Sequence, residues 1–386
     1  MRDQTVLISG AGIAGSTLAY WLARHGFRPT VVERATGLRS SGNPVDVKGP
    51  AMEVAQRMGL MPRLRAADSA VTHMSFVNAA GRRVGRINLQ AFQMSAGDRE
   101  PEVPRAELAS ILLEASRDSA EFLWDDAIVA LSRDKDGVNV TFDRAEPRRF
   151  DLVIGADGLH SAVRRLTFGP ENDFVHHMGI YVATLPIDGS VDNHREVTLY
   201  NTPGRMVSVH PSRGHAVAAF MFRSPALPNF DHRDTEQHKQ LVTTIFRDGS
   251  WRIPELLERV QAADDIYFDS VSQVRLPQWS NGRITVLGDA ASCMSLFGDG
   301  STLAIAGAHT LAEELAANRT DPATAFRRYE TRHRTLVDPK QRGFASAAAL
   351  IVPATRKGIA ARNMATRLFF PVMTAAGSLR RRLRPT

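Results

Sequence analysis

Apolar residues at the start of the chain follow first a strand-like and then a helical pattern. Thr5 to Ser9 is a continuous run rich in β-branched residues, which predicts a strand buried on both faces. Ser16 to His25 places apolar residues at helical spacing, and Gly26 ends this helix. Thr30 to Val32 is the next strand. This order of strand, helix and strand predicts a βαβ unit with parallel strands.

Strand-like patterns dominate the middle of the chain. A hairpin at residues 71–88 and a helix from Glu102 to Ser116 precede a region, 172–276, that is typical of an antiparallel sheet. The strands predicted there are Ile180–Pro186, Arg195–Tyr200, Met206–Pro211, Ala216–Arg223 and Ile266–Leu276. The later helices are predicted at Gln237–Phe246, Pro254–Ala262, Leu303–Ala317 and Pro322–Leu336, with a buried strand at Arg283–Leu287.

The sequence therefore predicts an α/β protein in which a Rossmann-like domain is interrupted by an antiparallel sheet. Residues 1–171 and 277–340 form the predicted nucleotide-binding domain, and residues 172–276 form the predicted substrate-binding sheet. The hairpin at 71–88 falls in the first segment but can join that sheet. Residues 341–386 are predicted to be C-terminal helices.

Three glycines follow the first strand at the spacing G-x-G-x-x-G. Gly10 permits a tight turn, Gly12 lets a diphosphate approach the backbone, and Gly15 lets the helix lie close to the strand. The helix start, which includes Ala14, offers free N–H groups and a partial positive charge to the diphosphate. Glycines that only form turns are the alternative explanation. The full order of strand, glycines, helix and strand favours an adenine dinucleotide site.

An acidic residue completes this fingerprint. Glu33 ends the second strand and lies 18 residues after Gly15 (33 − 15), where an acid that binds ribose hydroxyls is expected. Arg34 follows it and is a further candidate for cofactor binding.

Two further glycine–aspartate motifs each follow a predicted strand. Asp157 and Gly158 come after the strand Phe150 to Ile154, and Gly288 and Asp289 come after the strand near residue 285. Open α/β sheets bind ligands beyond the carboxyl ends of their strands, where a carboxylate can accept hydrogen bonds from sugar or ribityl hydroxyls. One such pair alone is usually a turn. Three motifs in this order indicate a shared cofactor site.

Composition limits the alternatives. The 386 residues are 43% hydrophobic and 23% charged, as in an ordinary soluble protein, and no apolar run is long enough to span a membrane. The net charge of +7 lies partly in the C-terminal arginines, so we expect no nucleic-acid partner. We expect a cytoplasmic location. Cys293 is the chain's one cysteine, and no histidine pair has metal-ligand spacing, so we expect no metal.

The three motifs together resemble those of the class A flavoprotein aromatic hydroxylases, the para-hydroxybenzoate hydroxylase-like family. The resemblance covers nearly the whole chain and implies a Rossmann-like FAD-binding domain of the GR2 type. It implies that the first motif holds the ADP part of FAD, that Asp157 and Gly158 lie on the FAD and NADPH paths, and that Asp289 binds the ribityl chain. Arg105, in VPRAEL, matches the family's FAD-contacting arginine; a surface charge at a helix start is the alternative.

Within this family, the segment SSGNPVDVKG resembles that of the tetracycline-inactivating and polyketide-hydroxylating branch. The likeness implies that Asp46 contacts FAD and that Arg39 meets FAD or NADPH, with NADPH bound transiently near Arg39 and Arg164. After the GD motif the sequence departs from the family: SCMSLFGDGSTLA has Ser292 for the usual histidine and lacks the usual prolines. Gly298 and Gly300 still provide a turn near the isoalloxazine ring.

The resemblance implies a monooxygenase that uses FAD, NADPH or NADH, and O2, and that oxygenates a substrate through a flavin C4a-hydroperoxide. The expected substrate is a small polycyclic aromatic or polyketide-type molecule, with tetracycline-like antibiotics among the candidates. A flavin dehydrogenase or reductase without oxygen insertion, and a flavoprotein that sequesters a ligand, are the alternatives. A monomer or weak homodimer is expected.

Side chains along a strand alternate between the two faces of a sheet, and this alternation suggests where the substrate binds. One face carries Ser208 and His210, and a face of the next strand carries Ala218, Phe220 and Phe222; one of these faces should line the substrate cavity. The candidates for a catalytic base are His210, His215 and Tyr200, although each of these residue types is more often a structural or surface group.

Overall fold

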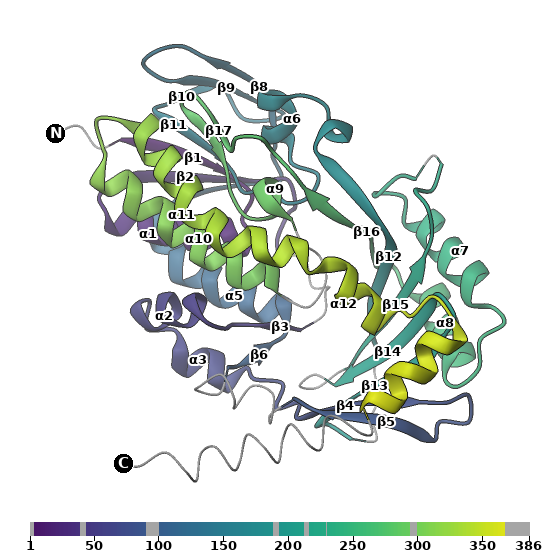
Figure 1. The fold of residues 1–386 in the computed structure, drawn as a ribbon. Coiled ribbons are helices and arrows are strands. Elements are labelled where there is room, and N and C mark those ends of the chain that lie inside the picture. The colour runs from purple at the N-terminus through teal and green to yellow at the C-terminus, as the bar shows by residue number, and fades with distance from the viewer. Residues whose placement is uncertain are drawn as a thin grey trace, which may run out of the picture.

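Two large sheets organise the chain (Figure 1). The computed structural model describes residues 4–38, 44–89, 100–187, 193–211, 216–228, 230–293 and 299–366. Within these residues, no helix has the length and apolar character that a membrane span requires.

A six-stranded sheet contains the N-terminal βαβ unit. Its order is β17-β18-β11-β1-β2-β7, and all pairs are parallel except β17 with β18. The strands are β1 (Thr5–Ser9), β2 (Arg28–Glu33), β7 (Glu121–Trp124), β11 (Leu152–Gly155), β17 (Ser280–Asn281) and β18 (Ile284–Val286). Because β1 lies between β2 and β11, and β18 lies beside β11, the strands that precede the three motifs are close neighbours. The predicted Rossmann-like α/β fold is confirmed.

A seven-stranded sheet follows the order β16-β12-β15-β14-β13-β4-β5. Its strands are β4 (His73–Val77), β5 (Arg83–Asn88), β12 (Val175–Ile187), β13 (Glu196–Thr202), β14 (Arg205–Pro211), β15 (Ala216–Arg223) and β16 (Tyr267–Val274). β4 pairs with β13 in parallel, and the other pairs are antiparallel. The hairpin predicted at 71–88 therefore lies in this sheet.

Helices surround both sheets (Figure 1). α1 (Ile13–Arg24) packs against α5 (Arg105–Ser116) and α10 (Asp299–Ala317), and α10 packs against α11 (Pro322–Arg342). α7 (Thr235–Phe246) and α8 (Ile253–Ala262) pack on the seven-stranded sheet. The shorter helices are α2 (Pro50–Arg57), α3 (Met61–Ala66), α6 (Ala162–Phe168), α9 (Asp289–Ser292) and α12 (Phe344–Ile351), with 3-10 turns η1 (Arg117–Ser119) and η2 (Glu171–Asp173). The described residues from 341 to 366 are mainly helical, as expected.

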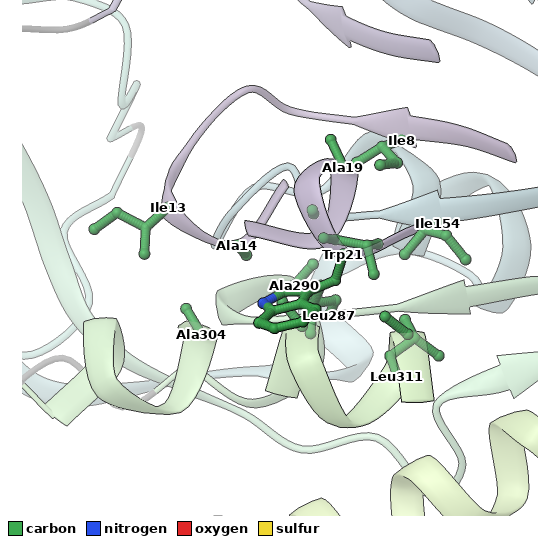
Figure 2. Close-up of a cluster of buried hydrophobic side chains, with 14 of the residues drawn as sticks. Ile8, Ile13, Ala14, Ala19, Trp21, Ile154, Leu287, Ala290, Ala304 and Leu311 are labelled. Atoms are coloured by element: carbon green, nitrogen blue, oxygen red, sulfur yellow. The ribbon is translucent and has the colours of Figure 1, made fainter. Parts of the chain in front are cut away.

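One hydrophobic core joins β1, β11, α1 and α10. Figure 2 shows Ile8, Ile154, Trp21 and Leu311 from these four elements in a single cluster. Ile8, Ile154 and Leu311 are almost completely buried, which is expected for a parallel sheet covered by helices.

Several short elements were not predicted. β3 (Val45–Asp46) pairs with β6 (Glu102–Val103) in a two-stranded ribbon, so the helix predicted from Glu102 begins only at Arg105, after Pro104. β10 (Arg148–Phe150) was not predicted either; it forms a three-stranded sheet with β9 (Val138–Phe142) and β8 (Ile128–Arg133), which lie where the sequence predicts strands, at Val138–Asp143 and Ala127–Arg133. Two-residue strands leave almost no periodic signal in a sequence, because their pairing depends on a distant partner. The ribbon brings Asp46 beside Glu102.

Candidate functional site

The N-terminus of α1 is built to receive an anion. Gly12 is the residue before the helix, and no acidic residue lies in the first turn. The first N–H groups of a helix have no partner within it, so they are available to a phosphate. No atom of the described residues lies within 4 Å of the position that a Cβ atom on Gly12 would take. α1 begins at Ile13, three residues earlier than predicted, so its free N–H groups follow Gly12 directly.

Gly10 and Gly15 are required by close packing. Gly10 has φ +103°, and a Cβ atom there would lie 2.6 Å from the carbonyl oxygen of Ala156. A Cβ atom on Gly15 would lie 1.9 Å from the carbonyl oxygen of Gly10. The first motif therefore packs directly against the loop that contains Asp157.

Glu33 holds the glycine turn from the neighbouring strand. Its Oε2 atom accepts a hydrogen bond of 2.9 Å from the N–H of Ala11, and its Oε1 atom accepts one of 3.0 Å from the N–H of Ala35. The carboxylate thus lies beside the first motif, where the sequence placed a ribose-binding acid. Arg34 follows it at the end of β2.

The third motif reaches the same place. A Cβ atom on Gly288, whose φ is +63°, would lie 3.1 Å from the Cβ atom of Ala14 on α1. Ala290, which follows Asp289, belongs to the same buried cluster as Ala14 (Figure 2). The Oδ1 atom of Asp289 lies 3.6 Å from the Cβ position of Gly300, near the start of α10. The three motifs, separated in sequence, therefore meet around the N-terminus of α1.

Asp157 mainly stabilises its own loop. Its carboxylate accepts hydrogen bonds from the Oγ atoms of Ser161 and Ser9, at 2.5 and 3.3 Å, and from the N–H of Val163 at 3.1 Å. Burial raises the pKa of Asp157, and these hydrogen bonds oppose the shift. Gly158 has φ +80° and open space at its Cβ position, so a ligand can approach the backbone there.

Arg164 does not border an open groove, and the prediction that it helps bind NADPH is wrong on this point. Its side chain is completely buried. It donates hydrogen bonds to the carbonyl oxygens of Leu159, at 2.5 Å, and Ala290, at 3.2 Å, and pairs with Glu171 at 3.4 Å. Arg164 therefore connects the second motif to the residues that follow Asp289.

Asp46 and Arg105 belong to neighbouring short elements, because Asp46 lies on β3 and Arg105 begins α5 just after β6, the partner strand of β3. Arg105 is exposed at the first position of α5, and its guanidinium group has no ion-pair partner among the described residues. The Nζ atom of Lys48 lies 3.2 Å from Oδ2 of Asp46 and 3.0 Å from Oδ1 of Asp299, the first residue of α10. The backbone carbonyl of Asp46 also accepts a hydrogen bond of 3.0 Å from Thr302.

A family model described as "FAD binding domain" matches residues 3–337, which is most of the chain. A flavin-dependent monooxygenase from Legionella longbeachae serogroup 1 (strain NSW150) is 33% identical over 344 residues, covering 88% of each chain. The chain belongs to the class A flavoprotein monooxygenases. This confirms the family resemblance drawn from the sequence, the enzyme class and FAD as the cofactor.

Two solved structures resemble this monooxygenase over nearly its whole length. The crystal structure of tetracycline destructase Tet(55) is 32% identical, with a TM-score of 0.81, and the match covers 96% of this chain and 97% of that chain. The structure of tetracycline destructase Tet(51) is 27% identical, with a TM-score of 0.83, covering 97% and 98%.

The residues of the monooxygenase fit FAD. The open position at Gly12, the free helix N-terminus and the exposed Arg105 offer partners for a diphosphate. Glu33 would hold the adenosine ribose, Asp289 and Gly288 the ribityl chain, and Asp46 and Gly300 would lie toward the ring end. Bound flavin supplies the electron transfer and the oxygen activation. The protein must position the substrate and keep water away from the reacting atoms.

One face of the seven-stranded sheet is closed by helices of the monooxygenase. Ala218, Phe220 and Phe222 are buried in a cluster with Val242 and Leu256 of α7 and α8. The expectation that these three residues line the substrate cavity is wrong, because their side chains fill a packed core. Tyr200 lies in the same cluster, with its ring centroid 6.1 Å from that of Trp251. It faces the helices and cannot be the base for a substrate on the opposite face.

Ser208 and His210 lie on the opposite face of β14. In the register, Ser208 pairs with Ala219, and Val207 pairs with Phe220, so Ser208 faces away from the cluster on α7 and α8. This face is turned toward the FAD-binding part, because His210 reaches Glu102 of β6. Ser208 remains a prediction for a substrate-lining residue.

His210 is an ion-pair partner rather than a free base. Its Nε2 atom lies 3.1 Å from Oε1 of Glu102, and its Nδ1 atom donates a hydrogen bond of 2.9 Å to the carbonyl oxygen of Pro211. Burial alone would lower the pKa of His210, but the charge of Glu102 raises it. Burial alone would raise the pKa of Glu102, but the charge of His210 and the hydrogen bonds from His210 and Ser69 together lower it. Both ring nitrogens of His210 therefore already have partners, and its candidate role as a base remains a prediction.

The second motif is also joined to the seven-stranded sheet. His160 follows Gly158, and its Nδ1 and Nε2 atoms lie 2.9 Å from Glu171 and 3.3 Å from Asp269. Its ring stacks on that of His232, with centroids 3.8 Å apart. Burial would lower the pKa of His160, but the hydrogen bonds to Asp269 and Glu171 raise it to about 9.

Three predicted site residues, Arg39, His215 and Gly298, lie outside the described residues. Sequence reasoning in turn missed Glu102, Lys48 and His160. Lys48 lies two residues after Asp46, and His160 lies inside the second motif, so the sequence motifs could have indicated both. Glu102 carried no signal, because it was assigned to a helix and its partners are distant in sequence.

Proposed function

We propose that this enzyme uses NADPH or NADH to hydroxylate a polycyclic aromatic or polyketide-type molecule, with tetracycline-like antibiotics as the leading candidates. The observation that carries the proposal is the convergence of the three motifs around the N-terminus of α1, next to the face of the seven-stranded sheet that carries His210. The likeness to two tetracycline destructases, at 27 and 32% identity over nearly the whole chain, supports the substrate class.

The arrangement suits oxygen insertion into a small apolar substrate. The sheet face that carries Ser208 also carries Met206, Val182 and Leu199, whose side chains are buried in an apolar cluster with Ala348 and Ile351 of α12. Apolar packing of this kind beside the cofactor can keep water away from the reacting atoms. The hydroxyl group of Ser208 offers one polar contact among these apolar side chains.

The proposal is tested by NADPH oxidation with a panel of tetracyclines, aromatic polyketides and simple phenols, under 18O2. The expected result is oxidation stimulated by a polycyclic member and a product that has gained one labelled oxygen atom. Asp289→Ala should lose FAD and this activity together. Asp248→Ala is the matched control, because this exposed carboxylate pairs with Arg205 away from the three motifs.

Other outcomes would overturn the proposal. Stimulated oxidation with products that contain no labelled oxygen would identify a dehydrogenase or reductase. Tight ligand binding with NADPH oxidation at background for every compound would identify a sequestering flavoprotein.

A further inference from the structure

A buried ion pair joins the seven-stranded sheet to the FAD-binding part of the chain. His210 stands near the end of β14, and its side chain is 13% exposed. Glu102 of β6 is 21% exposed, and its second carboxylate oxygen accepts a hydrogen bond of 2.5 Å from Ser69. Both groups of this pair therefore have polar partners, as a charge pair removed from water requires.

Glu102 stands directly opposite Asp46. The two residues are paired in the register of β3 and β6, and directly opposed side chains of an antiparallel pair lie roughly 5 Å apart at their Cβ atoms. Like charges in this arrangement repel. Burial raises the pKa of Asp46, and Glu102 contributes to the shift, whereas Lys48 opposes it.

Lys48 and His210 flank this pair of carboxylates, Lys48 at Asp46 and His210 at Glu102. Lys48 contacts Asp46 at 3.2 Å and Asp299 at 3.0 Å, while Lys340 contacts Asp299 at 2.7 Å. On the other side His210 contacts Glu102. The charges of Glu102 and, more weakly, Asp46 act on His210. The β3–β6 ribbon is thus held by α10 at Asp46 and by the seven-stranded sheet at Glu102.

Loss of the His210 charge would change the ribbon. Glu102 would then be a buried carboxylate without a cation, facing a second carboxylate, and removing one partner of a buried pair is strongly unfavourable. This cost is relieved if the ribbon moves away from the sheet or if the carboxylate of Glu102 binds a proton. Either response alters Asp46.

We propose that the His210–Glu102 pair is the contact through which the seven-stranded sheet holds the β3–β6 ribbon, and with it Asp46, in position to bind FAD. His210 is then a positioning residue, because it acts on the cofactor through Glu102 and Asp46. The inference rests on the proposed contact between Asp46 and FAD.

The test is a double-mutant cycle read by FAD affinity. Apoprotein of the wild type, His210→Gln, Glu102→Gln and the double variant is titrated with FAD by flavin fluorescence. Each single variant should raise the Kd about tenfold, within the roughly 5- to 150-fold range typical of coupled sites. The double variant should bind no more weakly than either single one, because both changes remove the same contact.

The pH dependence separates this role from a general loss of stability. Because the folded-state pKa of His210 is raised, its contribution is present below about 6.5 and is lost as the pH rises through the folded value. The wild type should bind FAD more weakly over that rise, and His210→Gln should lack this component. His238→Gln is the control: His238 is buried and bonds the carbonyl oxygen of Asp231 at 2.8 Å, away from the ribbon.

Two results would overturn the inference. If Asp46→Asn weakens FAD binding while His210→Gln and Glu102→Gln do not, the FAD site stands and the positioning role is excluded. If the two single effects add fully in the double variant, the pair is not the contact. An unchanged FAD affinity in both Asp46→Asn and Arg105→Ala would instead reject the proposed site. If His210→Gln does not fold, Glu102→Gln and the wild-type pH series still decide.

Discussion

The Cβ position of Gly10 lies 2.6 Å from the carbonyl oxygen of Ala156 and 3.0 Å from the Cα atom of Asp157. The first two motifs are therefore in backbone contact, and neither can move without the other. With Gly288 against Ala14, the same helix start meets the third motif. This convergence explains how three short sequences about 130 to 150 residues apart form one cofactor site.

Gly10 and Gly12 should respond differently to alanine. Gly10→Ala places a Cβ atom against backbone that cannot yield, at a φ of +103°, and should destabilise the fold by roughly 1–3 kcal/mol or more. Gly12→Ala meets open space and should leave the unfolding midpoint of the apoprotein nearly unchanged while weakening FAD binding. Chemical denaturation and FAD titration of both variants check this. Equal stability losses in the two would contradict the geometry.

Arg105→Ala should weaken FAD binding without destabilising the apoprotein. A cation in the first turn of a helix opposes the helix dipole, so its removal should be neutral or stabilising by about 0.3–1 kcal/mol. Thermal unfolding without FAD and FAD titration measure the two effects. Arg63→Ala is the control, because Arg63 is exposed and paired with Glu114 on α5. FAD affinity equal to that of the wild type would remove Arg105 from the site.

The two faces of the seven-stranded sheet should be distinguishable by mutation. Phe220→Ala should cost about 3–5 kcal/mol of stability, since the side chain is completely buried against α7. Ser208→Ala should change stability little but alter the KM of a responsive substrate. Urea unfolding and steady-state kinetics test this pair. A Phe220 variant of normal stability with a changed KM would return that face to the substrate cavity.

His160 should make stability fall as the pH rises. Its folded pKa of about 9 exceeds the ordinary 6.5, so its stabilisation is complete below 6.5 and disappears as the pH rises toward 9. The loss should be up to roughly 3 kcal/mol, from about 1.4 kcal/mol per pH unit. Denaturation of the wild type and His160→Gln between pH 6 and 9.5 measures it. The difference between the two should shrink across this range; a constant difference would argue against a protonated His160.

The sequence by itself determined the βαβ unit, the order of the three motifs and the cofactor class. Gly10 and Gly288 adopt positive φ angles, and Gly12 leaves open backbone at a helix start; these are local requirements that glycine spacing records directly. Strand positions such as Ala216–Arg223 were also predicted well, because their length and β-branched or aromatic content are local properties.

Only the tertiary structure decided which sheet face α7 and α8 cover and which charges meet. Along β15 both faces are largely apolar, so alternation separates the two faces but cannot show which one the helices cover. The same holds for His210 and Arg164. The sequence does not show whether a histidine or arginine side chain is free or paired with a carboxylate, as His210 is with Glu102 and Arg164 with Glu171. Pairing and burial are set by contacts in the folded chain.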